Sequence, residues 1–108
     1  MATSHRVFYK QLNGKVPTNF NLVGANITRR SVILVTAAPC SLGVGQGFFD
    51  PDIRLNVHGP EVRVSNIVPH GPEPNTGGVE FVLDVASQTD VAVTITVLEP
   101  WDSFTLGN

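Results

Sequence analysis

Apolar and polar residues alternate along the second half of the chain. Three segments place Val, Ile, Leu or Phe at every second position: 53–57, 79–85 and 91–97. Side chains two residues apart in an extended strand point to the same face. Each segment is therefore predicted to turn its apolar residues to one side and residues such as Glu80 and Thr94 to the other. This alternation is typical of an antiparallel sheet that is covered on one face.

The first half combines short apolar runs with strong turn signals. Residues 7–12 precede Asn13-Gly14, a dipeptide that readily adopts a type I′ turn, so we expect a hairpin to open the domain. Pro17 has no backbone donor, which predicts an edge or a bend in the returning strand. Residues 31–37 form a continuous apolar run, which predicts a central strand buried on both faces.

The spacing of these runs predicts the fold class. Gly, Pro, Asn and Asp interrupt the apolar runs at short intervals, and no run has the spacing of an amphipathic helix. Any helix is expected to be a single turn near Trp101–Phe104. We therefore predict one all-β domain over residues 1–108, an antiparallel β-sandwich of about seven or eight strands. An immunoglobulin-like sandwich is favoured, with a jelly roll as the alternative.

The segment 53–97 resembles the last four strands of bacterial immunoglobulin-like modules. The resemblance rests on three runs: LNVHGPEVRVSN at 55–66, VEFVLDV at 79–85 and VAVTITV at 91–97. It covers less than half of the chain, and residues 1–52 depart from the pattern. A resemblance of this kind concerns the fold, and implies at most a spacer or adhesion module.

Charge and hydropathy argue against several classes of partner. The chain has seven Lys and Arg against nine Asp and Glu, a net charge of −2. It therefore lacks the basic surface that binds phosphate backbones or anionic lipids. No apolar stretch approaches the length of a membrane span, and the first residues lack the apolar core of a Sec signal. We expect neither a nucleic-acid partner nor a membrane partner.

Cys40 is the single cysteine, so no disulfide can form within the chain. This favours a reducing compartment, and we expect either the cytoplasm or a place within an exported assembly. Arg29-Arg30 before an apolar stretch resembles a twin-arginine signal, but strand-like residues precede it and a buried strand is the preferred interpretation. No signature of nucleophilic catalysis surrounds Cys40, so a buried structural role and no catalytic residue are predicted.

Two patterns suggest cation binding, and each has a simpler explanation. His58 and His70 begin two copies of His-Gly-Pro-Glu, but one strand between them would separate the two turns by roughly 25 Å. One zinc ion cannot bind both at that distance. Asp50 and Asp52 have the spacing of calcium ligands, although Asp50-Pro51 also initiates turns. No metal and no cofactor are predicted.

Sparse charge favours an assembling protein. Charged residues make up 15% of the chain, whereas a small monomer usually relies on abundant surface charge for solubility. Phe48, Phe49 and Trp101 are the predicted contact residues. Phe48 and Phe49 are adjacent, so they face opposite sides of an extended segment, and one is expected at an interface. Trp101 follows the last strand, where it either covers the core or lies between subunits.

These observations lead to two hypotheses for function. The first is a non-enzymatic structural or protein-interaction module that acts as a subunit of a homo-oligomer or larger assembly. The second is a module that binds a carbohydrate or another small ligand through the loops 38–52 and 69–78, which are rich in Gly and Pro. Sugar sites stack rings on exposed aromatic side chains, so the exposure of Trp101 and Tyr9 bears on the second hypothesis.

Overall fold

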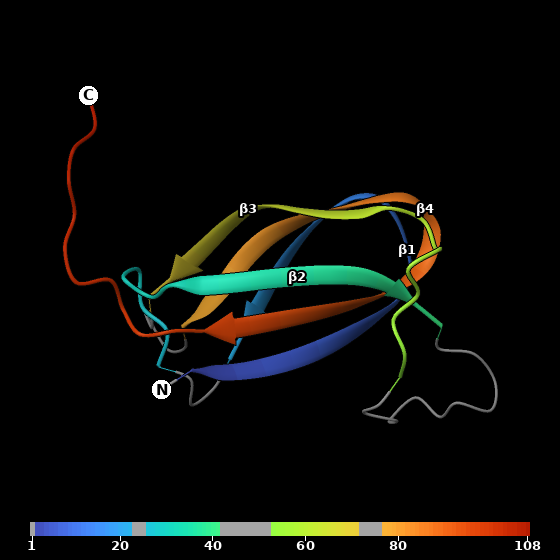
Figure 1. Cartoon of the computed structure of the whole chain (residues 1–108), viewed down its shortest axis with the longest axis horizontal. Coiled ribbons are helices and arrows are strands. Elements are labelled where there is room, and N and C mark those ends of the chain that lie inside the picture. Colours follow the sequence, from blue (N-terminus) through green and yellow to red (C-terminus); the bar gives the residue numbers. More distant parts are fainter. Residues whose placement is uncertain (1, 23–25, 42–52, 72–76) are drawn as a thin grey trace.

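The computed structural model describes residues 2–22, 26–41, 53–71 and 77–108. In these ranges the chain forms four strands and no helix: β1 (Thr3–Asn21), β2 (Ile33–Cys40), β3 (Val62–His70) and β4 (Gly78–Val97). Every strand pairing is antiparallel and involves β4 (Figure 1). The predictions of an all-β chain and an antiparallel sheet are confirmed.

β4 is the central strand. Its first half, residues 78–85, pairs with β1 on one side and β3 on the other, whereas its second half, residues 91–97, pairs with β1 and β2. The alternating apolar residues of both halves are buried, as the sequence pattern predicts: Val79, Phe81, Leu83, Val85, Val91, Val93, Ile95 and Val97.

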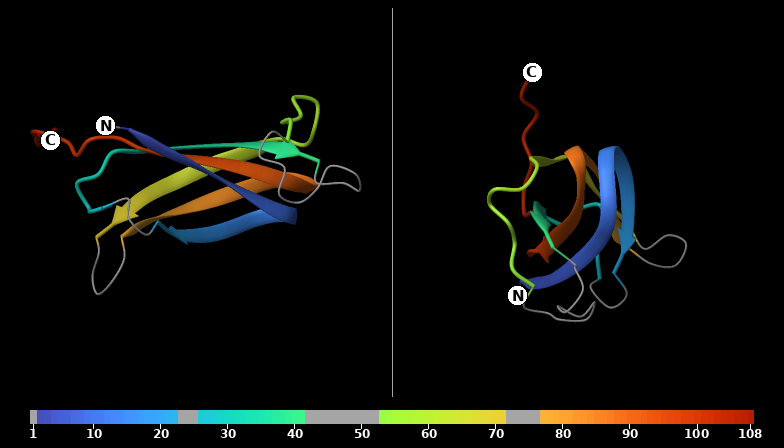
Figure 2. Two further views of the ribbon diagram at one scale, coloured as in Figure 1. Left: turned by 90° about the horizontal axis from the view of Figure 1, so that it is seen from below. Right: turned by 90° about the vertical axis from the view of Figure 1, so that its right-hand side faces the viewer.

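The sheet curves over on itself at the bend of β4 (Figures 1 and 2). Val85 and Val91 are six residues apart, an even number, so the same face of the strand points inward on both sides of the bend. The two halves of the sheet therefore enclose one apolar cluster. Ile27 and Ile33 contribute to this cluster from outside β4.

β1 differs from the predicted opening hairpin because it continues through Asn13-Gly14. Between the pairs Tyr9–Val91 and Leu12–Thr89, β1 holds one residue more than β4, which is a β-bulge. Gln11 has a φ of 55° and Gly14 a φ of 75° at this bend. The extra residue changes the alternation, so that Tyr9 before it and Leu12 after it both pack against the core. Gly14 thus serves a bend within one strand.

β2 differs from the predicted central strand because it pairs with β4 alone. Its residues alternate between buried and exposed from Ile33 to Thr36, and Leu34 is 54% exposed. The apolar run predicts cover on both faces, but among the described residues no layer covers the outer face, and this prediction is wrong. Pro17, by contrast, lies in β1, which pairs on one side only in the described sheet, as its missing donor predicts.

The described strands are fewer and longer than the seven or eight that we predicted. Residues 7–12 and 15–16 belong to one strand, as do 79–85 and 91–97. The expected strand over residues 53–57 is absent: Leu55 forms a single bridge to Cys40, and Val57 lies in a turn. Long strands that bend without breaking explain the difference, because turn-forming residues at a bend look the same in sequence as those in a loop.

Candidate interaction site

The C-terminal segment, residues 98–108, leaves the sheet where β4 ends. Its first residues continue the pairing with the chain that precedes β2. Leu98 donates a backbone hydrogen bond to the carbonyl of Val32 (2.8 Å), and Trp101 donates one to the carbonyl of Arg30 (3.0 Å). Beyond Trp101 the chain is extended and points away from the sheet (Figure 1).

Trp101 is held by Arg30. The Arg30 guanidinium carbon lies 4.3 Å from the centre of the indole ring, and one guanidinium nitrogen donates to the Trp101 carbonyl at 3.5 Å. A cation over an aromatic face is attracted by the ring quadrupole. Phe104 meets the indole edge-on, with ring centres 5.9 Å apart. Arg30 therefore fixes the start of the segment, while Phe104 contacts Trp101.

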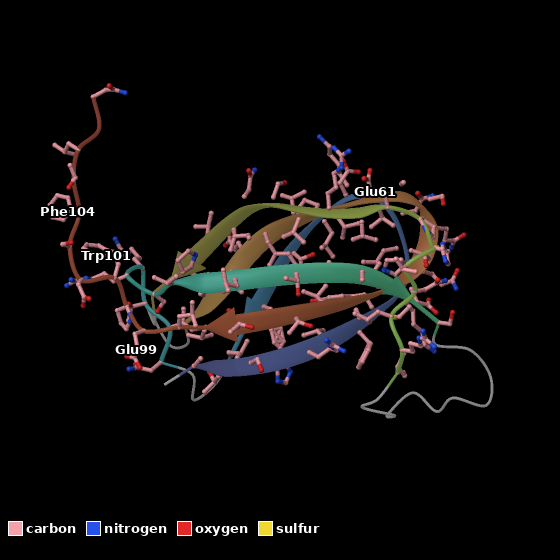
Figure 3. All side chains as sticks on the ribbon, viewed as in Figure 1. Glu61, Glu99, Trp101 and Phe104 are labelled. Carbon is pink, nitrogen blue, oxygen red and sulfur yellow. The ribbon has the colours of Figure 1, made fainter. Side chains whose placement is uncertain are left out.

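The large apolar side chains of this segment are exposed. Trp101 is 38% exposed, Phe104 76% and Leu106 86%. Figure 3 shows Trp101 and Phe104 along the chain where it leaves the sheet. Trp101 contacts Arg30 and Phe104 and is not among the residues of the apolar core cluster. The single helical turn expected near Trp101–Phe104 is also absent, because these residues form neither a helix nor a turn.

Sequence reasoning missed Leu106, although a signal was present. Phe104 and Leu106 alternate with Ser103 and Thr105, as in a strand with one apolar face. Residues 103–106 have the sequence pattern of a short β-strand, although the structure assigns no strand to them. The signal is weak because only two apolar residues carry it.

A second feature, which we call the β2–β3 cleft, lies at the other end of the molecule. It is lined by residues 37–39, 55–57 and 59–62 and has a volume of about 540 Å³. One wall is a tight turn. The backbone nitrogen of Asn56 donates to the Pro39 carbonyl (2.7 Å), and the Asn56 side-chain oxygen accepts from the His58 nitrogen (3.1 Å).

Gly59 brings this turn close to β2. A Cβ at that position would lie 2.7 Å from Pro39 Cγ, so any larger residue would push the turn away. Val57, at the tip of the turn, is 89% exposed. The alternation of residues 53–57 placed Val57 on a strand face beside Leu55, and that prediction is wrong. The turn-forming residues Asn56 and Gly59 are the feature of the sequence that indicates a turn here.

The other predicted contact residues, Phe48 and Phe49, lie outside the described residues, as do Asp50 and Asp52. The loops 38–52 and 69–78 are described only at their ends. His58 precedes β3 and His70 is its last residue, and the His70 ring bonds the Asn19 side chain at 2.8 Å. Over the described ranges, no group of three metal-binding side chains converges, and no helix has the length and hydrophobicity of a membrane span.

Cys40 is buried at the end of β2 in a small cluster with Ile53 and Ala92. Burial raises the pKa of the Cys40 thiol above its ordinary value, and the negative charge of Asp90 raises it further, whereas Arg6 acts in the opposite direction. A thiol with a raised pKa stays protonated at neutral pH and is a poor nucleophile. The expectation of a buried cysteine is confirmed.

Comparison with protein-family models, curated proteins and solved structures finds no match to this chain.

Proposed function

We propose that this chain is a non-enzymatic β-sandwich module of the immunoglobulin-like kind that acts through protein contacts, as a subunit of a homo-oligomer. The observation that carries the proposal is the C-terminal segment with its exposed Trp101, Phe104 and Leu106. Burying one such side chain contributes about 1.5–3 kcal/mol. A partner surface that covers these side chains is therefore stabilised by apolar contact. The apolar cluster shared by both halves of the sheet supports the sandwich.

The charge on β1 supports assembly through the C-terminal segment rather than through strand edges. β1 pairs on one side only in the described sheet, and such an edge can template a second chain. It carries Arg6, Lys10 and Lys15 and no Asp or Glu. Two copies that met edge to edge along β1 would bring like charges together. The C-terminal segment carries Glu99 and Asp102 and no Lys or Arg, so its contact with a neutral or basic surface of another copy meets no such repulsion.

The carbohydrate hypothesis has less support. Trp101 lines a polar hollow together with Thr28, Glu99 and Asp102, which is the composition of a sugar site. However, Arg30 covers one face of the indole ring, and Phe104 packs against the ring. Tyr9 is half-buried against the core, where burial raises the pKa of its hydroxyl. These contacts take up ring surface on which a sugar would stack.

Self-association of the full chain tests the proposal. Sedimentation velocity from low to high micromolar concentration should show a mass that rises with concentration, because the apolar side chains of the C-terminal segment become covered as copies meet. The variant Phe104→Ser with Leu106→Ser should shift this rise to higher concentration. Val68→Ser, at another exposed apolar position on β3, is the control and should associate as the unchanged chain does. A full chain that stays monomeric at high micromolar concentration contradicts the proposal.

A further inference from the structure

The pairing of β1 with β4 is interrupted at Asn13, in the bend of β1 (Figure 2). Leu12 pairs with Thr89 and Gly14 pairs with Val85. Between these two pairs β1 has Asn13 alone, whereas β4 has residues 86–88. An unequal count of this kind disrupts the ladder locally. Asn13 therefore has no partner residue in the described sheet, and it is exposed.

Gly14 removes the steric obstacle to a rotation of the peptide plane after Asn13. Because a peptide unit is planar, this rotation changes the ψ of Asn13 and the φ of Gly14 together. Glycine accepts positive and negative φ about equally. Gly14 has a φ of 75°, and a Cβ placed on it would have no atom within 4 Å. The backbone nitrogen of Gly14 can therefore approach the side-chain carbon Cγ of Asn13 without a clash from a side chain at position 14.

This approach allows a ring to close within the chain. The Gly14 nitrogen attacks Cγ of Asn13 and forms a carbon–nitrogen bond, and Nδ2 leaves as ammonia with the proton that the backbone nitrogen gives up. The product is a five-membered cyclic imide. Water then adds to one imide carbonyl carbon, the bond from that carbon to the Gly14 nitrogen breaks, and the nitrogen regains a proton. Opening at Cγ gives aspartate, and opening at the backbone carbon gives isoaspartate. The two steps consume one water and release one ammonia, with no oxidation or reduction.

Asn66 provides a comparison within the same molecule. It is also exposed and also lies at an irregularity, the register shift between Ser65 and Val68 of β3. It is followed by Ile67, whose branched Cβ crowds the backbone and limits its conformations. Asn13-Gly14 is the only Asn-Gly pair in the chain. The same ring closure is therefore hindered at Asn66 and favoured at Asn13.

We infer that Asn13 is a site of spontaneous deamidation in the folded chain, with the Gly14 backbone nitrogen as the nucleophile and water as the co-reactant. This inference is independent of the proposed function. The new carboxyl group is ionised at neutral pH. It adds a negative charge to β1, which otherwise carries Arg6, Lys10 and Lys15 and no Asp or Glu. The modification thus changes the charge of this edge strand as the protein ages.

Timed incubation of the full chain at mildly alkaline pH, followed by peptide mass spectrometry, tests the inference. The peptide that contains Asn13 should gain the mass difference between an amide and a carboxyl group, and enzymatic methylation of isoaspartate should label the same peptide. The chain unfolded in guanidinium is incubated in parallel until its Asn13 has converted. Over that time the folded chain should convert at Asn13 and keep the amide of Asn66.

Two matched variants assign the charge change to one residue. Asn13→Gln keeps an amide but would need a six-membered ring, so the more acidic species that isoelectric focusing detects in the aged chain should be lost. Asn66→Gln is the control and should acquire that species as the unchanged chain does. The inference is overturned if Asn13 of the folded chain is still an amide once the unfolded chain has converted, because pairing with β4 then protects it. Equal conversion of Asn66 and Asn13 in the folded chain overturns the role of Gly14.

Discussion

Cys40 illustrates how a single residue responds to its surroundings. It ends β2, bridges Leu55 across the connection to β3, and packs with Ile53 and Ala92. Burial is the main reason that its pKa is raised, with the charge of Asp90 second. Because burial disfavours the charged thiolate, the folded chain holds the thiol proton to a higher pH than the unfolded chain does.

We expect Cys40 to resist alkylation and to make stability depend on alkaline pH. At neutral pH iodoacetamide should modify the folded chain at least about tenfold more slowly than the chain in guanidinium, because the thiol is both buried and protonated. The free energy of unfolding should fall as the pH rises through the ordinary thiol pKa, since only the unfolded chain then releases the proton.

Cys40→Ala is the control for the second effect. It should lose the part of the pH dependence that begins at the ordinary thiol pKa and keep the part that Tyr9 contributes at higher pH, because burial also raises the pKa of Tyr9. Equal alkylation rates for the folded and unfolded chain, or an unchanged pH slope in Cys40→Ala, would contradict this account of the site.

At the scale of elements, β4 acts as the common partner of the other described strands, and its inward face supplies most of the core. Phe81 lies on this face between β1 and β3, opposite Thr18, and is 1% exposed. Phe104, of the same residue type, lies in the C-terminal segment and is mostly exposed. Substitutions at Phe81 therefore report on the stability of the sheet, and substitutions at Phe104 report on the contacts of the C-terminal segment.

Truncating the two phenylalanines should change the free energy of unfolding by very different amounts. Phe81→Ala should lower the free energy of unfolding by about 3–5 kcal/mol, because it leaves a cavity in a close-packed core. Phe104→Ala should change it by less than about 0.5 kcal/mol, as expected for an exposed side chain. Guanidinium denaturation followed by far-ultraviolet circular dichroism measures both, at a concentration low enough to keep the chain monomeric. A loss of similar size in the two variants would show that the C-terminal segment packs on the sheet.

At the scale of the whole molecule, the sheet cannot form until β4, the last strand along the sequence, is present. β1, β2 and β3 each form a strand ladder with β4 alone, and Thr3 pairs with Val97 near the far end of the chain. Such pairings join residues that are distant in sequence, and the entropy of closing these long loops opposes folding until β4 is available.

Two truncations from the same end test this dependence on β4. The chain 1–77 lacks β4 and should show no strand signal in circular dichroism, because no described strand ladder survives the deletion. The chain 1–97 keeps β4 and loses only the C-terminal segment with its two backbone hydrogen bonds and its contact with Arg30. It should retain the dispersed amide spectrum of a folded sheet. A folded 1–77 would refute the central role of β4.

The local pattern of the sequence determined the strand content and the buried face. Val79, Phe81 and Leu83 are buried where alternation placed them, because the direction of a side chain in an extended strand depends only on its position along that strand. The turn signals marked the right places, but Asn13-Gly14 bends a strand instead of ending it. Which of these outcomes occurs depends on whether a partner strand continues past the bend, and here β4 does.

Only the tertiary structure decided which strand is central and which apolar residues stay exposed. β2 is as apolar as a central strand, yet it lies at an edge because no further strand pairs with it in the described sheet. The C-terminal segment and the β2–β3 cleft each look unremarkable in sequence. They lie at opposite ends of β2: Val97, where the chain leaves the sheet, pairs with Ile33, whereas Asn56 of the turn bonds to Pro39. Such features depend on contacts between residues that are distant in sequence. The alternation of apolar and polar residues along a strand carries no information about these contacts.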